Sequence, residues 1–186
     1  MNIGFALCGS LCTFSKVFPV METLAETHRL IPILSQPSGT IDSRFGLAED
    51  HIARLTAICG MPPIRAIEEA EPIGPKKLLD ALIIAPCTGN TLAKLAHSIA
   101  DGPVTMAAKS HLRNGRPVLV AISTNDALAG AAENIGRLLA RKHYYFVPFG
   151  QDDPMSKPTS IVADFQQIPA ALELALEGKQ LQPILL

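Results

Sequence analysis

The 186-residue sequence contains no tryptophan, only 5% aromatic residues and only 18% charged residues. Hydrophobic residues make up 48% of the chain, so the composition excludes an intrinsically disordered protein. The length predicts one domain, residues 1–186, because domains typically span roughly 100 to 200 residues. So much apolar sequence in a chain of this size also favours a homo-oligomer over a monomer.

Neither sign of charge is in excess. Sixteen Lys and Arg residues against seventeen Asp and Glu give a formal net charge of -1. This balance excludes the basic footprint of a nucleic-acid-binding or polybasic membrane-surface protein. The first residues, MNIGFALCGSLCTF, lack the basic segment of a secretory signal. No apolar run approaches the ~20 residues of a membrane-spanning helix, so we expect a cytoplasmic protein.

Cysteines and familiar catalytic motifs are also scarce. The four cysteines are Cys8, Cys12, Cys59 and Cys87. They form no CxxC pair and no zinc-type cluster with histidine, so we expect no metal site and interpret the thiols as small, mostly buried side chains in a reducing compartment. The motifs GxGxxG, GxSxG and HExxH are absent, which argues against the usual dinucleotide fingerprint and against hydrolases of those two types.

What the sequence does contain is a regular alternation of short apolar runs and helical patterns. Strands are predicted at residues 2–8, 30–34, 64–67, 81–85, 117–122 and 144–149. Helices are predicted at residues 15–28, 47–59, 92–99, 104–112, 127–142 and 168–176. The alternation predicts an α/β fold, a doubly wound parallel sheet of about six strands with helices on both faces.

Two polar loops follow the first and fourth predicted strands. In the doubly wound order 3-2-1-4-5-6 these strands are neighbours, so residues 9–13 and 86–91 should flank one crevice. Each loop supplies hydroxyl groups, a glycine and the free amides of a helix N-terminus, an arrangement suited to a phosphate. The alternative is that Ser10, Thr13 and Thr88 only cap their helices.

The run APCTGNTLAKLA, residues 85–96, followed by Asp101, resembles the flavoprotein family of phosphopantothenoylcysteine decarboxylases and lantibiotic-type cysteine decarboxylases. The glycine and serine after the first strand fit the same family. The resemblance implies a Rossmann-like fold with flavin mononucleotide, FMN, as cofactor. By position it implies cofactor-binding roles for eight residues: Gly9, Ser10, Thr13, Ser35, Thr88, Asn90, Thr91 and Asn125.

The sequence departs from the decarboxylases at two places. Their Pro-Ala-Met-Asn segment, which surrounds the substrate carboxylate, is here Ile122, Ser123, Thr124 and Asn125. From the residues alone the polar strand end, residues 123–126, is either part of the crevice or a helix cap. No histidine matches their catalytic motif either, since His51 has different neighbours. Decarboxylation is therefore in doubt, and the catalytic residues, including a general base, remain unassigned.

A closer similarity within the family involves the segments AEPIGPKKLLD, VTMAAKSHLRN, STNDALAGAAENIG and YYFVPFGQDDP. These resemble a subunit of an oxidoreductase that converts dihydrodipicolinate to dipicolinate in the mother cell of sporulating bacteria, together with an A subunit. The hydride acceptor is then either FMN or a nicotinamide nucleotide, NAD(P), brought by the A subunit.

The substrate implied by this similarity is a small dicarboxylate, for which we expect a cationic anchor among Lys109, Arg113 and Arg116. From the residues alone, compensation of a helix dipole and solvation explain these cations better than ligand binding does. Two alternative functions stay open: a flavin-dependent decarboxylase of a cysteinyl compound, and a non-catalytic scaffold subunit with a degenerate flavin site.

Overall fold

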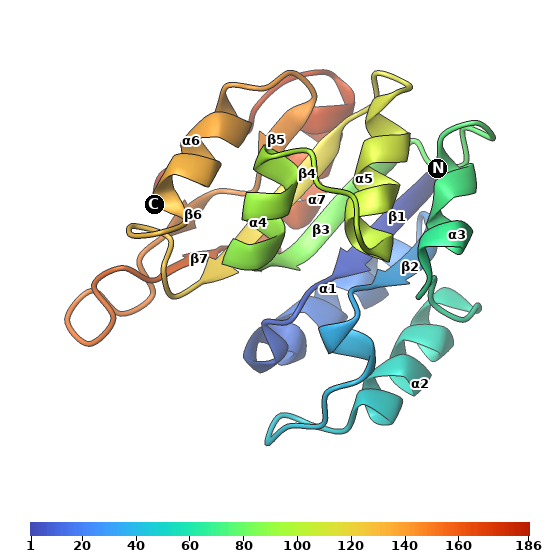
Figure 1. Ribbon diagram of the computed structural model, residues 1–186, viewed down its shortest axis with the longest axis horizontal. Coiled ribbons are helices and arrows are strands. Elements are labelled where there is room, and N and C mark those ends of the chain that lie inside the picture. The colour runs from blue at the N-terminus through green and yellow to red at the C-terminus, as the bar shows by residue number, and fades with distance from the viewer.

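The computed structural model describes residues 1–186, which form one sheet covered by helices on both faces (Figure 1). The strands are β1 (Asn2–Leu7), β2 (Arg29–Leu34), β3 (Ala81–Cys87), β4 (Val118–Thr124), β5 (Tyr144–Phe146), β6 (Phe149–Gly150) and β7 (Ile161–Ala163). Strands β2, β1, β3, β4 and β5 pair in parallel in that order. The predicted α/β, Rossmann-like fold is confirmed.

The helices are α1 (Phe14–Ala25), α2 (Ala48–Cys59), α3 (Ile67–Ala70), α4 (Gly89–Ala96), α5 (Pro103–Leu112), α6 (Ala132–Leu139) and α7 (Ile168–Leu176). Helices α4, α5 and α6 lie in front of the sheet in Figure 1, whereas α1 and α7 lie behind it. None of the helices has the length and apolar character needed to cross a membrane.

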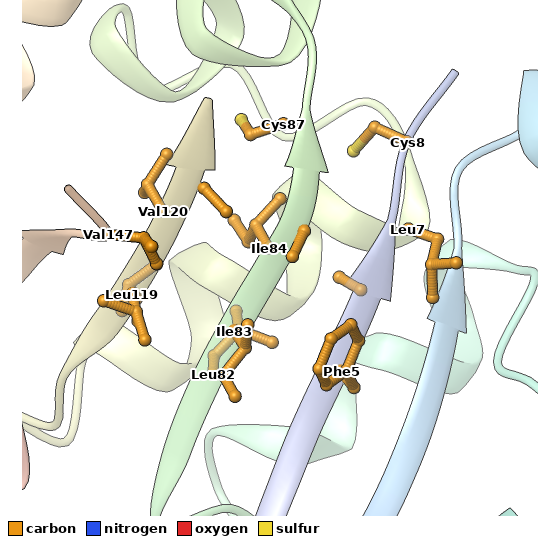
Figure 2. Packing of buried hydrophobic residues seen from close by; sticks show 14 of the residues in the cluster. Phe5, Leu7, Cys8, Leu82, Ile83, Ile84, Cys87, Leu119, Val120 and Val147 are labelled. Atoms are coloured by element: carbon orange, nitrogen blue, oxygen red, sulfur yellow. The ribbon is translucent and has the colours of Figure 1, made fainter. Parts of the chain in front are cut away.

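The core is one cluster of 48 buried residues centred on β3. All seven residues of β3 are buried, as expected for a parallel strand covered on both faces, whose sequence is continuously apolar instead of alternating. Figure 2 shows the side chains of β3 packed between those of β1 and β4. This packing fixes the three strand ends from which the candidate site is built.

The predicted third strand, residues 64–67, is wrong. Ile64 forms only one parallel bridge, to Ile33 of β2. The next two backbone N–H groups, of Arg65 and Ala66, donate instead to the Glu69 carboxylate at 2.9 and 3.1 Å. This side chain draws the chain away from the sheet and into α3, so no strand continues.

Two other predicted elements are shorter than expected. The helix expected over residues 127–142 covers only α6, because residues up to 131 form turns in which the Asp126 carbonyl accepts from the N–H groups of Ala129 and Ala131. The strand expected over residues 144–149 is interrupted at Pro148, which has no N–H to donate. Beyond it, β6 pairs antiparallel with β7, and β7 pairs antiparallel with the end of β4.

Candidate functional site

The carboxyl ends of β1, β3 and β4 meet at one edge of the sheet, and the loops that follow them touch one another. The Ser10 hydroxyl, after β1, lies 2.8 Å from the Ser123 hydroxyl near the end of β4. This hydrogen bond passes over the end of β3, which lies between the two strands. Thr13 supports the loop by donating from its hydroxyl to the Ser10 carbonyl at 2.8 Å.

A cavity of about 770 Å³, the large cavity, opens above this edge. Five of the residues expected to bind the cofactor line it: Ser10, Thr13, Thr88, Asn90 and Asn125. The wall also carries Asp126, from the polar end of β4, and four charged residues that sequence reasoning did not identify: Lys16, Arg44, Lys157 and Asp152. The cavity is therefore polar and strongly charged.

A second cavity of about 400 Å³, the small cavity, adjoins the large one. The other expected residues, Gly9, Ser35 and Thr91, line it together with the N-terminus of α5. Thr88 and Asn90 line both cavities and so form the wall between them. We refer to the two cavities together as the cleft; it contains all eight residues expected at the cofactor.

Of the three residues that could only cap their helices, Ser10, Thr13 and Thr88, one does so with its side chain. The Thr88 hydroxyl accepts the N–H of Thr91 at 3.4 Å and caps α4. Neither Ser10 nor Thr13 makes a side-chain cap hydrogen bond. In addition, N–H groups in the first turn of α4 have no acceptor within the helix, which leaves them available to an anion.

Two glycines shape the cleft in different ways. A Cβ atom on Gly89 would lie 2.6 Å from an Asp126 carboxylate oxygen and 2.9 Å from the Thr124 hydroxyl, so only glycine lets α4 start this close to the end of β4. A Cβ atom on Gly9 would have only the Pro37 side chain nearby, at 3.7 Å. Gly9 is therefore compatible with a larger residue in the fold itself, but that residue would take up space in the small cavity.

The charges of the cleft are unequally paired. Lys94, in the small cavity, pairs with Asp101 at 2.9 Å, and Lys157 pairs with Asp152 at 3.3 Å. Lys16 and Arg44, in contrast, have no acidic partner. These two side chains give the large cavity cations that are free to meet an anionic ligand.

The sequence contains one signal for Lys16 and none for Arg44. Lys16 follows Thr13 by three residues, a spacing that places both side chains on the same side of the first turn of α1. Arg44 lies in an irregular loop, where its guanidinium stacks 4.8 Å above the ring of Phe45. Nothing in the local sequence distinguishes it from an ordinary solvated arginine.

Two cysteines lie beneath the cleft at the ends of β1 and β3 (Figure 2). Burial raises the pKa of the Cys8 thiol to about 11, partly opposed by a hydrogen bond with Thr91. Burial likewise raises the pKa of Cys87 well above its usual value. Both thiols therefore stay protonated near neutral pH and do not act as nucleophiles. Of the four cysteines, Cys12 is exposed and lines the large cavity.

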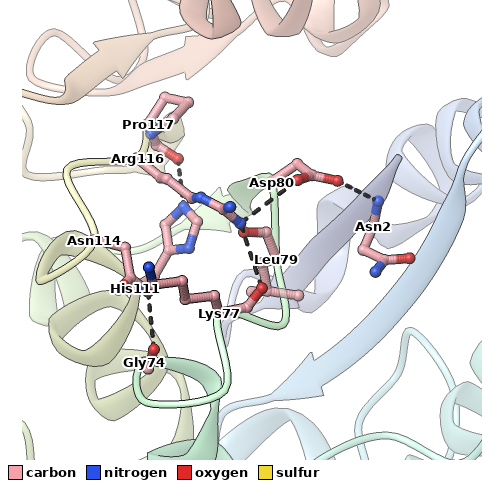
Figure 3. Close-up of polar contacts among 9 residues, drawn as sticks. All are labelled: Asn2, Gly74, Lys77, Leu79, Asp80, His111, Asn114, Arg116 and Pro117. Atoms are coloured by element: carbon pink, nitrogen blue, oxygen red, sulfur yellow. Dashed lines mark hydrogen bonds and ion pairs between the residues drawn. The ribbon is translucent and has the colours of Figure 1, made fainter.

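The three cations expected to anchor a substrate are not in the cleft. Lys109 and Arg113 line a separate cavity between α4, α5 and the start of β5. Arg116 lies at the opposite, amino-terminal edge (Figure 3), where it donates to the Leu79 carbonyl and pairs with Asp80 at 3.5 Å. The reason is the direction of α5, which runs back from the cleft so that its C-terminus lies at the amino-terminal edge.

His111 belongs to the same amino-terminal edge and is fully buried. Its Nε2 hydrogen-bonds the Pro117 carbonyl at 3.0 Å, as Figure 3 shows, and its Nδ1 has no partner. Burial lowers the pKa of His111 from its usual 6.5 to about 4, although the Pro117 hydrogen bond works in the opposite direction. The imidazole is therefore neutral in the folded protein at pH 7.

The pKa of His111 predicts a loss of stability in mild acid. Between about pH 6.5 and pH 4 the unfolded state binds a proton that the folded state does not, so stability falls as the pH falls. At pH 5 this amounts to about 2 kcal/mol. We expect the difference in unfolding free energy between pH 7.5 and pH 5, measured by urea denaturation, to be smaller in His111→Gln. An unchanged difference would contradict the assignment.

The chain resembles known proteins over nearly its whole length. The family model described as Flavoprotein matches residues 1–164. The B subunit of dipicolinate synthase from Bacillus subtilis (strain 168) is 45% identical over 185 residues, which cover 99% of this chain and 92% of that protein.

Two solved structures extend the comparison. The dipicolinate synthase B subunit from Bacillus halodurans C superimposes with a TM-score of 0.91 at 46% identity, covering 100% of this chain and 95% of that one. DmrB of Burkholderia xenovorans, solved in complex with FMN and described as a cubic protein cage for redox transfer, gives a TM-score of 0.70 at 19% identity over 95% of each chain. At that identity the second comparison shows a shared fold.

Proposed function

This chain belongs to the Flavoprotein family, and we propose that it is a flavin-linked subunit of a dipicolinate synthase that holds FMN in the cleft. Together with an A subunit, it oxidises dihydrodipicolinate to dipicolinate in the mother-cell cytoplasm of a sporulating bacterium. The protein works as a homo-oligomer, in line with its apolar composition.

The observation that carries this proposal is the division of the cleft into two adjoining cavities with different chemistry. The small cavity offers hydroxyl groups and helix N-termini, while its one lysine is already neutralised by Asp101. The large cavity offers free cations and carboxylates. A cofactor with a phosphate and a separate anionic substrate require two such compartments side by side.

The residues present fit FMN. Hydroxyl groups of Ser35, Thr88 and Thr91, together with the first amides of α4, would hold its phosphate by charge-assisted hydrogen bonds. Gly9 leaves the space that the bound group requires, because a Cβ there would project into the small cavity. The isoalloxazine ring of FMN supplies a hydride acceptor, which amino-acid side chains do not provide.

The substrate binds in the large cavity. Oxidation of a dihydropyridine ring to a pyridine removes one hydride and one proton. Lys16 and Arg44 hold the two carboxylates of the substrate, in place of the cations expected from the sequence. Asp126 is the carboxylate in this cavity without a cationic partner and is our candidate for accepting the proton.

Purification of the chain alone, followed by titration with FMN and a visible spectrum, tests the cofactor. We expect binding of FMN with an oxidised-flavin band near ~450 nm. Failure to bind FMN or any other flavin would support a non-catalytic scaffold instead. Because this test requires no substrate, it separates the cofactor from the reaction.

Reconstitution with the A subunit tests the reaction. We expect dipicolinate to form from dihydrodipicolinate only when both subunits are present, and we expect its rate to depend on bound FMN. Dependence on added NAD(P) alone would move the hydride acceptor to the A subunit. Release of carbon dioxide from a cysteinyl peptide by this chain alone would favour the decarboxylase.

A further inference from the structure

A third cavity, of about 320 Å³, lies outside the cleft between the C-terminal half of α4, the outer face of α5 and the start of β5. Thr105, at its margin, is the single lining residue that this cavity shares with the cleft. Its apolar surface comes mainly from Leu95, Ile99, Leu112 and Tyr144.

The charged residues of this third cavity are all cations. Lys109, Arg113 and Arg141 line it, and no acidic residue does. In a chain whose formal net charge is -1, such a local excess is not explained by composition. An electrically positive rim around an apolar surface attracts anions and retains those with an apolar body.

The three cations differ in the contacts that their side chains make. The Arg141 guanidinium donates to the carbonyls of Leu95 and Ala96 at 3.0 and 2.7 Å, so it closes the C-terminal end of α4. Lys109 and Arg113 make no side-chain hydrogen bond or ion pair within the chain. Lys109 lies on α5 and Arg113 at its C-cap, four residues later in helical conformation, so the two side chains face the cavity together.

Tyr144 adds a polar group to the apolar surface. The residue as a whole is buried, with 8% of its surface exposed, and its hydroxyl makes no hydrogen bond within the chain but keeps contact with solvent. Burial raises the pKa of this phenol to about 12, so it remains a neutral donor. This hydroxyl is therefore available to donate a hydrogen bond to a ligand oxygen beside the two free cations.

We propose that the third cavity is a binding site for a small organic carboxylate with an aromatic or aliphatic body. The body packs against Leu95, Leu112 and the ring of Tyr144. The carboxylate lies between Lys109 and Arg113, where a guanidinium and an ammonium provide charge-assisted hydrogen bonds. This site is independent of the flavin and of the oxidation proposed for the cleft.

Calorimetric titration with 2-naphthoate tests the site, with 2-naphthamide as the uncharged molecule of the same shape. We expect 2-naphthoate to bind one per chain and 2-naphthamide to bind at least tenfold more weakly. The Lys109→Gln, Arg113→Gln double variant should weaken 2-naphthoate at least tenfold, because both cations are exposed side chains whose loss does not disturb the core. Tyr144→Phe should weaken it severalfold.

The matched control is Arg29→Gln with Lys142→Gln, which removes the same two charges from exposed positions outside the cavity. We expect this variant to bind 2-naphthoate as the unmodified chain does. Three outcomes would each overturn the proposal. The first is equal binding of 2-naphthoate and 2-naphthamide, and the second is an equal loss of 2-naphthoate binding in both double variants. The third is no binding to the folded chain because a second copy covers the cavity. None of these outcomes bears on flavin binding.

Discussion

Gly9→Val is expected to weaken FMN binding at least 100-fold while the apoprotein keeps its fold. A Cβ at this position meets only the Pro37 side chain, at 3.7 Å, so the loop accepts it without a backbone clash. The same atom and the two methyl groups beyond it would project into the small cavity, where the cofactor phosphate is proposed to lie. Loss of two charge-assisted hydrogen bonds at about 1.5 to 3 kcal/mol each is sufficient for this effect.

The comparison variants make the result specific to the cleft. Gly9→Ala, with one added carbon, should weaken FMN about tenfold. Gly136→Ala adds the same carbon on α6, where no atom beyond the adjacent residues and the helix backbone lies within 4 Å, and should leave FMN binding unchanged. Gly136→Ala should also stabilise the fold by about 0.5 to 1 kcal/mol because alanine favours a helix. Unchanged FMN affinity in Gly9→Val, measured by fluorescence titration, would place the phosphate elsewhere.

The parts of the fold that were readable from the sequence are those whose burial leaves a continuous apolar run. Strands β1, β3 and β4 are almost entirely buried, and their sequences are correspondingly apolar at successive positions. Strands β6 and β7 have two and three residues, and they form only because they pair antiparallel with each other and β7 pairs antiparallel with the end of β4. Such pairing is a tertiary contact and has no local periodicity.

The same distinction between local pattern and tertiary contact applies to the residues of the candidate site. Residues that directly follow strands were identifiable, because carboxyl ends of parallel strands gather at one edge. The three cations on and after α5 lie outside the cleft, and the fold contains the reason. A helix that returns the chain between parallel strands runs opposite to them, so Arg113 and Arg116 emerge at the amino-terminal edge. Lys16, near the start of α1, lies at the carboxyl-terminal edge by the same argument.

Replacement of Lys16 and Arg44 by glutamine is expected to lower kcat/KM for dihydrodipicolinate at least 100-fold in the reconstituted two-subunit enzyme. Both side chains line the large cavity and neither has an acidic partner, so each is available to one carboxylate. Each charge-assisted contact contributes about 1.5 to 3 kcal/mol, or roughly a factor of ten to a hundred. Because the carboxylates keep their charge during oxidation, we expect most of the loss in KM and little in kcat.

Two controls decide whether this loss comes from substrate binding. FMN affinity of the Lys16→Gln, Arg44→Gln variant should stay within about twofold of the original, since the phosphate is held in the other cavity. Arg29→Gln with Lys142→Gln removes the same charges at exposed positions outside the cleft and should leave KM unchanged. Equal effects of the two double variants would indicate general electrostatic attraction. A fall in kcat alone would instead assign Lys16 and Arg44 to the chemical step, because contacts made equally before and during reaction alter KM.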